Sequence, residues 1–168
     1  MTAIPIDSEV IEAARLAGVG VVKRTPITES AALSERYGGN VVFKAENLQR
    51  TGSFKIRGAM SKLASLGDAV KNGVVAGSAG NHAQSIAFAA RHHNIPCEIF
   101  VPAGASLSKM EAARSYGAIL SEGGDTLSDA VAAAQGRADA TGMIFCHPYD
   151  DPFVVAGQAT LGLELLED

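Results

Sequence analysis

The most constraining feature of this sequence is a regular alternation of short apolar runs with longer helical stretches. Each run is followed by such a stretch: 40–45 by 53–66, 73–76 by 81–93, 98–101 by 106–116, 118–120 by 125–141, and 143–146 by 152–166. This alternation is typical of a parallel sheet covered by helices. We therefore expect an α/β fold, a parallel sheet flanked by helices. Two earlier helical stretches, at residues 11–16 and 28–37, are expected in a different layer.

The composition argues against several classes of protein. The chain has 168 residues and a net charge of −4, without the basic excess of nucleic-acid binders. No apolar run approaches the roughly 18–20 residues of a membrane helix, and residues 1–10 lack the pattern of a secretory signal. Neither the two cysteines, Cys97 and Cys146, nor the four histidines show a metal-ligand spacing. We expect a cytoplasmic protein with no metal, nucleic-acid or membrane partner.

The turn after the first apolar run carries a lysine at the start of a helical stretch. It reads T-G-S-F-K-I-R-G at residues 51–58, with Ser53 or Thr51 as the expected N-cap. The helix dipole and the like charge of Arg57 are both expected to lower the pKa of the Lys55 amine. A lowered pKa suits a lysine that forms a Schiff base. The alternative is a solvated lysine on a helix flank.

Small residues build the turn after the second run, G-S-A-G-N-H-A-Q at residues 77–84. They leave backbone N–H groups exposed at a helix N-terminus, which suits a carboxylate or phosphate. Asn81 is placed to donate a hydrogen bond into the same crevice. The alternative is a plain turn in which Asn81 caps the helix.

Two further turns favour a structural interpretation. In G-G-D-T at residues 123–126, Asp125 is the expected N-cap. In H-P-Y-D-D-P at residues 147–152, Asp151 is the expected N-cap and Pro152 the first helical residue. A ligand-facing role for the His, Tyr and Asp of that turn is the less favoured alternative.

Taken together, these turns resemble the threonine (serine/threonine) dehydratases, which are pyridoxal-phosphate enzymes of the tryptophan-synthase β type. Four segments carry the resemblance in order: E-N-L-Q-R-T-G-S-F-K-I-R-G-A at 46–59, S-A-G-N-H-A-Q at 78–84, H-P-Y-D-D-P at 147–152 and A-G-Q-A-T at 156–160. The similarity covers nearly the whole chain. It implies the fold of type II pyridoxal-phosphate enzymes.

The resemblance also implies a cofactor, a reaction and roles for single residues. Lys55 would bind pyridoxal 5′-phosphate covalently and later take the substrate's α-proton, Asn81 would hydrogen-bond the cofactor's 3′-oxygen, and Phe54 would pack against the cofactor. The implied substrate-binding turn consists of Ser78, Ala79, Gly80, Asn81 and His82. The reaction would convert L-threonine or L-serine into 2-ketobutyrate or pyruvate and ammonia, in a homo-oligomer of amino-acid metabolism such as isoleucine biosynthesis.

Ala79 favours dehydration within this family. The related serine racemases have a serine at this position, and it acts as the base on the opposite face of the cofactor. Alanine has no proton to exchange there. A racemase-like enzyme and a non-catalytic amino-acid-binding module remain the two alternatives.

The resemblance also bears on domain organisation. The family's glycine-rich phosphate loop and the residue that contacts the pyridine nitrogen follow the helix that contains residues 157–160, and neither occurs before Asp168. We therefore expect these residues to be the N-terminal part of a longer enzyme. Residues 1–50 would belong to the large domain, 51–150 to the small domain, and 151–168 to the helix that returns to the large domain.

Overall fold

A computed structural model of the chain describes residues 5–70, 72–105 and 107–168. The helices are α1 (Ser8–Ala17), α2 (Ala31–Tyr37), α3 (Lys55–Ser65), α4 (Asn81–His92), α5 (Leu107–Ser115), α6 (Leu127–Thr141) and α7 (Pro152–Glu167), with 3-10 turns η1 (Glu46–Leu48) and η2 (Gly67–Val70). The strands are β1 (Ile27–Glu29), β2 (Val42–Lys44), β3 (Val74–Gly77), β4 (Cys97–Val101), β5 (Ile119–Glu122) and β6 (Ile144–Phe145). Ser106, where one expected helix began, and residues 1–4 of the segment considered as a signal lie outside the described residues.

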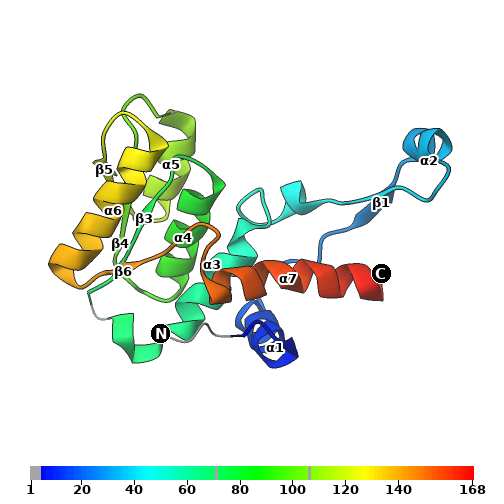
Figure 1. Ribbon diagram of the computed structural model, residues 1–168, viewed down its shortest axis with the longest axis horizontal. Helices are drawn as coiled ribbons and strands as arrows, with labels where there is room; N and C mark the ends of the chain where they lie inside the picture. The colour runs from blue at the N-terminus through cyan, green and yellow to red at the C-terminus, as the bar shows by residue number, and fades with distance from the viewer. Residues whose placement is uncertain (1–4, 71, 106) are drawn as a thin grey trace.

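Four parallel strands form the main sheet, in the order β5-β4-β3-β6. Helices α4 and α5 cover one face of this sheet and α6 covers the other (Figure 1). The expected α/β class is therefore confirmed. The chain runs outward from β3 through β4 to β5, and then β6 returns to the opposite side of β3. In open α/β sheets ligands bind at such a reversal, outside the carboxyl ends of the strands.

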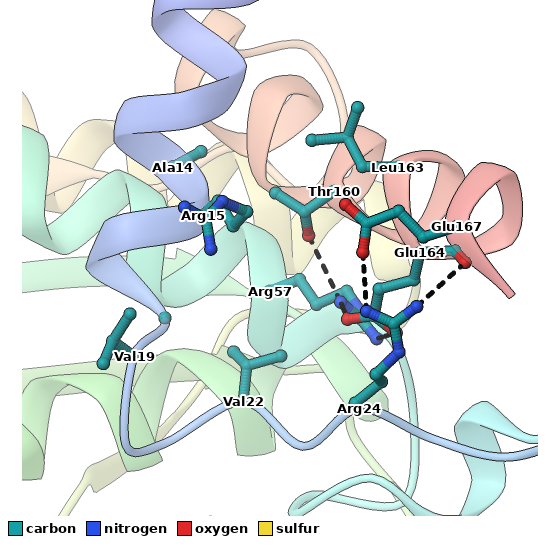
Figure 2. A pocket seen from close by; sticks show the side chains of 11 residues that line it. Ala14, Arg15, Val19, Val22, Arg24, Arg57, Thr160, Leu163, Glu164 and Glu167 are labelled. Atoms are coloured by element: carbon teal, nitrogen blue, oxygen red, sulfur yellow. Dashed lines mark hydrogen bonds and ion pairs between the residues drawn. The ribbon is translucent and has the colours of Figure 1, made fainter.

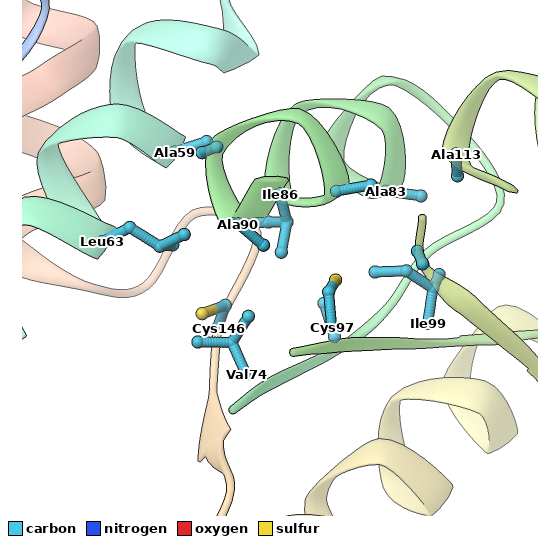
Figure 3. Packing of buried hydrophobic residues seen from close by; sticks show 14 of the residues in the cluster. Ala59, Leu63, Val74, Ala83, Ile86, Ala90, Cys97, Ile99, Ala113 and Cys146 are labelled. Atoms are coloured by element: carbon cyan, nitrogen blue, oxygen red, sulfur yellow. The ribbon is translucent and has the colours of Figure 1, made fainter. Parts of the chain in front are cut away.

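The core lies between β3, its neighbouring strands and α4. Figure 3 shows Val74, Cys97 and Cys146 packed opposite Ile86 and Ala90 of α4. All of these are buried, and small alanine side chains on α4 let the helix approach the sheet closely. Packing of this density fixes the end of β3 relative to the start of α4.

The segment before the main sheet differs from expectation. β1 and β2 pair antiparallel in a two-stranded sheet of their own, with Thr28 opposite Phe43. The expected helix at 28–37 was therefore wrong in its first residues, since the helix itself is α2 (Ala31–Tyr37). The run at 40–45 does contain a strand, β2, but that strand does not join the parallel sheet. With α2, this sheet projects away from the main body (Figure 1).

Helices α3 and α7 cross at two glycines. A Cβ at Gly157 would lie 2.5 Å from the Arg57 backbone oxygen and 2.6 Å from the Cα of Gly58. Beside this crossing, the buried Arg57 guanidinium forms ion pairs with Glu46 at 2.8 Å and with Glu164 of α7 at 2.7 Å. Figure 2 shows Arg57 and Arg24 pointing toward the Thr160–Glu167 face of α7. The start of α3 is thereby fixed to α7.

The helix N-caps confirm one expectation and correct another. Asp151 caps α7, accepting hydrogen bonds from two backbone N–H groups, and Pro152 is the first helical residue, as expected. Asp125 does not cap α6. Thr126 is the N-cap, because its hydroxyl accepts the N–H of Asp129 while the Asp129 carboxylate accepts the N–H of Thr126.

Candidate functional site

A cavity of about 510 Å³ lies at the carboxyl ends of β3 and β6. Between these two strands the order in which the chain adds strands to the sheet reverses. It is lined by Lys55, Gly77, Ser78, Asn81, His82, Leu127, Ser128, Val131, His147, Pro148 and Tyr149. These residues come from the starts of α3, α4 and α6 and from the segments that follow β3 and β6. The lysine turn and the asparagine turn, far apart in sequence, therefore meet in one cavity.

Lys55 is the first residue of α3, and its amine is held inside the cavity. Its Nζ donates a hydrogen bond to the Pro148 carbonyl at 2.7 Å and lies 5.3 Å from the centre of the Phe54 ring. Burial lowers the pKa of this amine below its ordinary value, because desolvation disfavours the charged form. The expectation of a lowered pKa thus agrees with the structure.

Two expected details of the lysine turn were wrong. Arg57 does not face Lys55, since its guanidinium is neutralised by Glu46 and Glu164 at the α3–α7 contact. Phe54 is the N-cap of α3, without a side-chain cap hydrogen bond, whereas Ser53 only accepts the N–H of Lys55 at 3.4 Å. The expected capping by Ser53 or Thr51 fails because Phe54 is already in the right-handed helical region.

The S-A-G-N-H turn at residues 78–82 forms the cavity wall at the start of α4. Gly80 is the N-cap and Asn81 the first helical residue, so the interpretation of Asn81 as a cap was wrong. The Ser78 hydroxyl accepts the N–H of Gly80 at 3.2 Å. Ser78, Asn81 and His82 line the cavity; Ala79, Gly80 and Phe54 are not among its lining residues.

His82 is the most buried ionisable residue of the cavity. Its Nε2 donates to the carbonyl of Cys146, just after β6, at 2.9 Å. Burial is the main cause that lowers the pKa of this ring to about 4; the hydrogen bond to Cys146 opposes the shift, and the nearby Lys55 and His147 add to it. The ring is therefore neutral at pH 7, and it links the start of α4 to the segment that carries Pro148.

Several cavity residues were missed by the sequence analysis. A ligand-facing role for His147 and Tyr149 was only the less favoured alternative, yet both line the cavity with Pro148, and the first turn of α6, with Leu127, Ser128 and Val131, was not considered. A Cβ at Gly77 would lie 2.5 Å from the Cα of Val131, so glycine is needed for α6 to lie against the end of β3. This wall could be identified only from the strand order, which places β6 beside β3 and is not visible in the local sequence.

Comparison with known proteins agrees with this architecture. The sequence profile of the family described as "Pyridoxal-phosphate dependent enzyme" matches residues 20–168. The chain belongs to this family. Pyridoxal phosphate, the cofactor expected from the sequence, is thus the cofactor on which this family depends.

Curated members of this family resemble the chain closely. It is 50% identical over 149 residues to an L-threonine ammonia-lyase of Thermotoga maritima, and these residues are 88% of this chain and 37% of that protein. It is 45% identical to the catabolic L-threonine dehydratase TdcB of Escherichia coli K12, with 98% of this chain and 50% of that protein covered. The chain thus spans half or less of the length of these two relatives.

Solved structures of the same family share the fold. Maize serine racemase superposes with a TM-score of 0.90 at 34% identity, covering 96% of this chain and 49% of that one. Threonine deaminase isoform 2 of Solanum lycopersicum superposes with a TM-score of 0.84 at 32% identity, covering 96% and 46%. The expected fold of type II pyridoxal-phosphate enzymes is confirmed.

Within residues 5–70, 72–105 and 107–168 no helix is long and apolar enough to cross a membrane. In the same ranges no group of three or more His, Cys, Asp and Glu side chains is placed to hold a metal ion.

Proposed function

We propose that this chain belongs to an enzyme that uses pyridoxal phosphate to dehydrate and deaminate L-threonine and L-serine. The products are 2-ketobutyrate or pyruvate, and ammonia. The observation that carries the proposal is that a half-buried lysine amine and a small-residue helix start share one cavity at the carboxyl ends of β3 and β6. The names of its relatives, L-threonine ammonia-lyase and L-threonine dehydratase, support the same substrates.

The cavity residues suit the chemistry of the cofactor. An aldehyde needs an amine that loses its proton readily, and burial lowers the pKa of Lys55. Asn81 is a neutral hydrogen-bond partner suited to the ring's 3′-oxygen, and Leu127 and Val131 offer apolar contact to its aromatic ring. We assign cofactor binding to Lys55, Asn81 and Phe54.

In this mechanism the residues of the chain bind substrate and move one proton. The helix start with Ser78 and Asn81 orients the substrate carboxylate toward backbone N–H groups. When bound, pyridoxal phosphate supplies an electron sink for negative charge at the substrate's α-carbon. Lys55, once released, takes the α-proton on Nζ. The β-hydroxyl would then leave as water with the proton that Lys55 Nζ has taken up, and hydrolysis of the released enamine would give the 2-keto acid and ammonia.

Ala79 separates dehydration from racemisation. The chain superposes well on maize serine racemase, so the fold does not decide between the two reactions. Racemisation needs a second proton carrier on the opposite face of the cofactor. The methyl group of Ala79, in the S-A-G-N-H turn, has no exchangeable proton. We therefore propose that ammonia release exceeds formation of D-serine.

We further propose the domain division and setting of this enzyme. Residues 51–150, which include the four-stranded sheet, form the small domain, and residues 1–50 and 151–168 belong to the large domain. The separate β1–β2 sheet supports this division. We propose that the enzyme acts in the cytoplasm as a homo-oligomer.

Steady-state kinetics of the holoenzyme test the proposed function. With L-threonine we expect ammonia and 2-ketobutyrate in equal amounts, and with L-serine more ammonia than D-serine. Lys55→Ala removes the proton carrier and is expected to abolish both products. Lys23→Ala is the matched control, since Lys23 lies outside the cavity. D-serine formed faster than ammonia, or activity that survives Lys55→Ala, would contradict the proposal.

A further inference from the structure

His147 lines the cavity but has no part in the reaction as derived so far. Its Nδ1 accepts the backbone N–H of Asp150 at 2.8 Å and that of Tyr149 at 3.3 Å. A backbone N–H only donates, so Nδ1 must hold a lone pair and the ring proton must be on Nε2. The hydrogen-bonding atom that His147 offers a ligand is therefore the donor Nε2–H.

His82 offers the complementary group to the same cavity. Its Nε2 is paired with the Cys146 carbonyl at 2.9 Å, and a carbonyl only accepts. Nε2 must therefore carry the proton, and Nδ1 keeps a lone pair. The hydrogen-bonding atom that His82 offers a ligand is an acceptor. Both rings line the same cavity.

One donor and one acceptor in the same cavity select among ligand groups. A carboxylate or a phosphate only accepts hydrogen bonds and leaves the His82 acceptor unpaired. An ammonium group only donates and leaves the His147 donor unpaired. A hydroxyl group donates one hydrogen bond and accepts others, so it satisfies both rings at once. Leaving either ring unpaired in a half-buried cavity costs binding free energy.

The position of Lys55 brings such a hydroxyl within reach. Its Nζ contacts the carbonyl of Pro148, the residue that follows His147. The α-carbon from which Lys55 removes a proton is two bonds from the oxygen of a β-hydroxyl. A substrate that reaches Lys55 thus places its β-hydroxyl in the same part of the cavity as the two rings.

We propose that His147 and His82 recognise the β-hydroxyl of the substrate, His147 as hydrogen-bond donor and His82 as acceptor. This inference rests on the proposed function and names its specificity-determining residues. His147 acts as a positioning residue for the leaving group. It does not transfer its proton, because Nδ1 is occupied by backbone N–H groups and has no place for a second one.

Two substitutions test the roles of the two ring nitrogens of His147 separately. His147→Asn places an amide oxygen where Nδ1 accepts the N–H of Asp150, so the turn is kept while the distal donor is lost. His147→Gln extends an amide N–H to the position of Nε2 and restores the donor. Comparison of the pair thus isolates the distal donor from the integrity of the turn.

The measurement is kcat/KM of the holoenzyme with L-serine divided by kcat/KM with β-chloro-L-alanine. Chloride leaves without the donor–acceptor pair that a hydroxyl uses. Loss of one hydrogen bond corresponds to about a tenfold change, so we expect the ratio to fall about tenfold in His147→Asn. In His147→Gln we expect it to stay within about threefold of the unsubstituted protein.

Other outcomes would overturn the inference. An unchanged ratio in His147→Asn, or the same fall in both variants, would assign His147 to the turn alone. Loss of pyridoxal-phosphate affinity with an unchanged ratio would assign the ring to the cofactor. If the unsubstituted holoenzyme eliminated neither substrate, the proposed function itself would have failed.

A second measurement needs neither activity nor substrate. Two-bond proton–nitrogen correlation spectra of the ligand-free chain report which ring nitrogen of each histidine carries the proton. We expect the proton on Nε2 of both His82 and His147 at pH 7. A proton on Nδ1 of either ring would remove the donor–acceptor pair and overturn the inference directly.

Discussion

At the scale of single residues, His82 couples the cavity to the stability of the fold. The ring is almost fully buried, and its proton on Nε2 is committed to the Cys146 carbonyl. Burial lowers its pKa from the ordinary 6.5 to about 4. Between these two values the unfolded chain binds a proton that the folded chain does not. The free energy of unfolding must therefore fall as the pH falls through this window.

We expect acid titration of stability to show this directly. A pKa lowered by about 2.5 corresponds to about 3 kcal/mol lost between pH 6.5 and pH 4. Urea unfolding at successive pH values measures this loss. His82→Gln keeps a donor for the Cys146 carbonyl but has no titrating group, so its profile should be flatter by about the same amount. Parallel profiles for the two proteins would contradict the assignment.

The local sequence was sufficient to identify Lys55 but not to predict the direction of its neighbour Arg57. The position of Lys55 at a helix start follows from the local sequence. The direction of Arg57 does not, because it is set by Glu46 and Glu164, which approach from η1 and α7. Neither partner is a local neighbour, so the like charge expected beside Lys55 is in fact neutralised at another contact.

At the scale of elements, the close crossing of α3 and α7 depends on glycine. The backbone of α3 lies against Gly157, with no room for a Cβ. The next glycine along α7, Gly162, has nothing within 4 Å of a Cβ placed there. The helix thus contains a glycine that packing requires and one that it does not.

Alanine substitution should separate these two glycines. Gly157→Ala is expected to lower the free energy of unfolding by about 1–3 kcal/mol through overpacking. Gly162→Ala is expected to raise it by up to about 1 kcal/mol, because alanine is the better helix former at an open position. Urea midpoints of the two variants measure the difference. A stabilised Gly157→Ala would show that α3 and α7 do not cross as closely as described.

The sequence predicted the elements that local patterns determine and missed those that depend on distant pairing. Apolar runs followed by amphipathic stretches identified β3 to β6 and the helices after them. β1 is three residues long and is stabilised by its pairing with β2. Its local sequence was therefore interpreted as the start of a helix. The order of the strands is equally non-local. For that reason His147 and Tyr149, after β6, were not assigned to the cavity beside β3.

At the scale of the whole molecule, the cavity exists because the strand order reverses between β3 and β6, although all four strands are parallel. The starts of α3, α4 and α6 all point toward this place, and each contributes lining residues. The reversal brings a lysine, a small-residue turn and two histidines together from segments that are separated in sequence. The family relationship and the cavity chemistry therefore support the same site for pyridoxal phosphate.

The most direct test of this account is to identify the residue that binds the cofactor. The protein is incubated with pyridoxal phosphate, reduced with borohydride to make the bond permanent, digested, and mapped by mass spectrometry. We expect the label on Lys55 and its loss in Lys55→Ala, while Lys23→Ala keeps it. A label on another lysine, or label that persists in Lys55→Ala, would contradict the assignment of this cavity as the cofactor site.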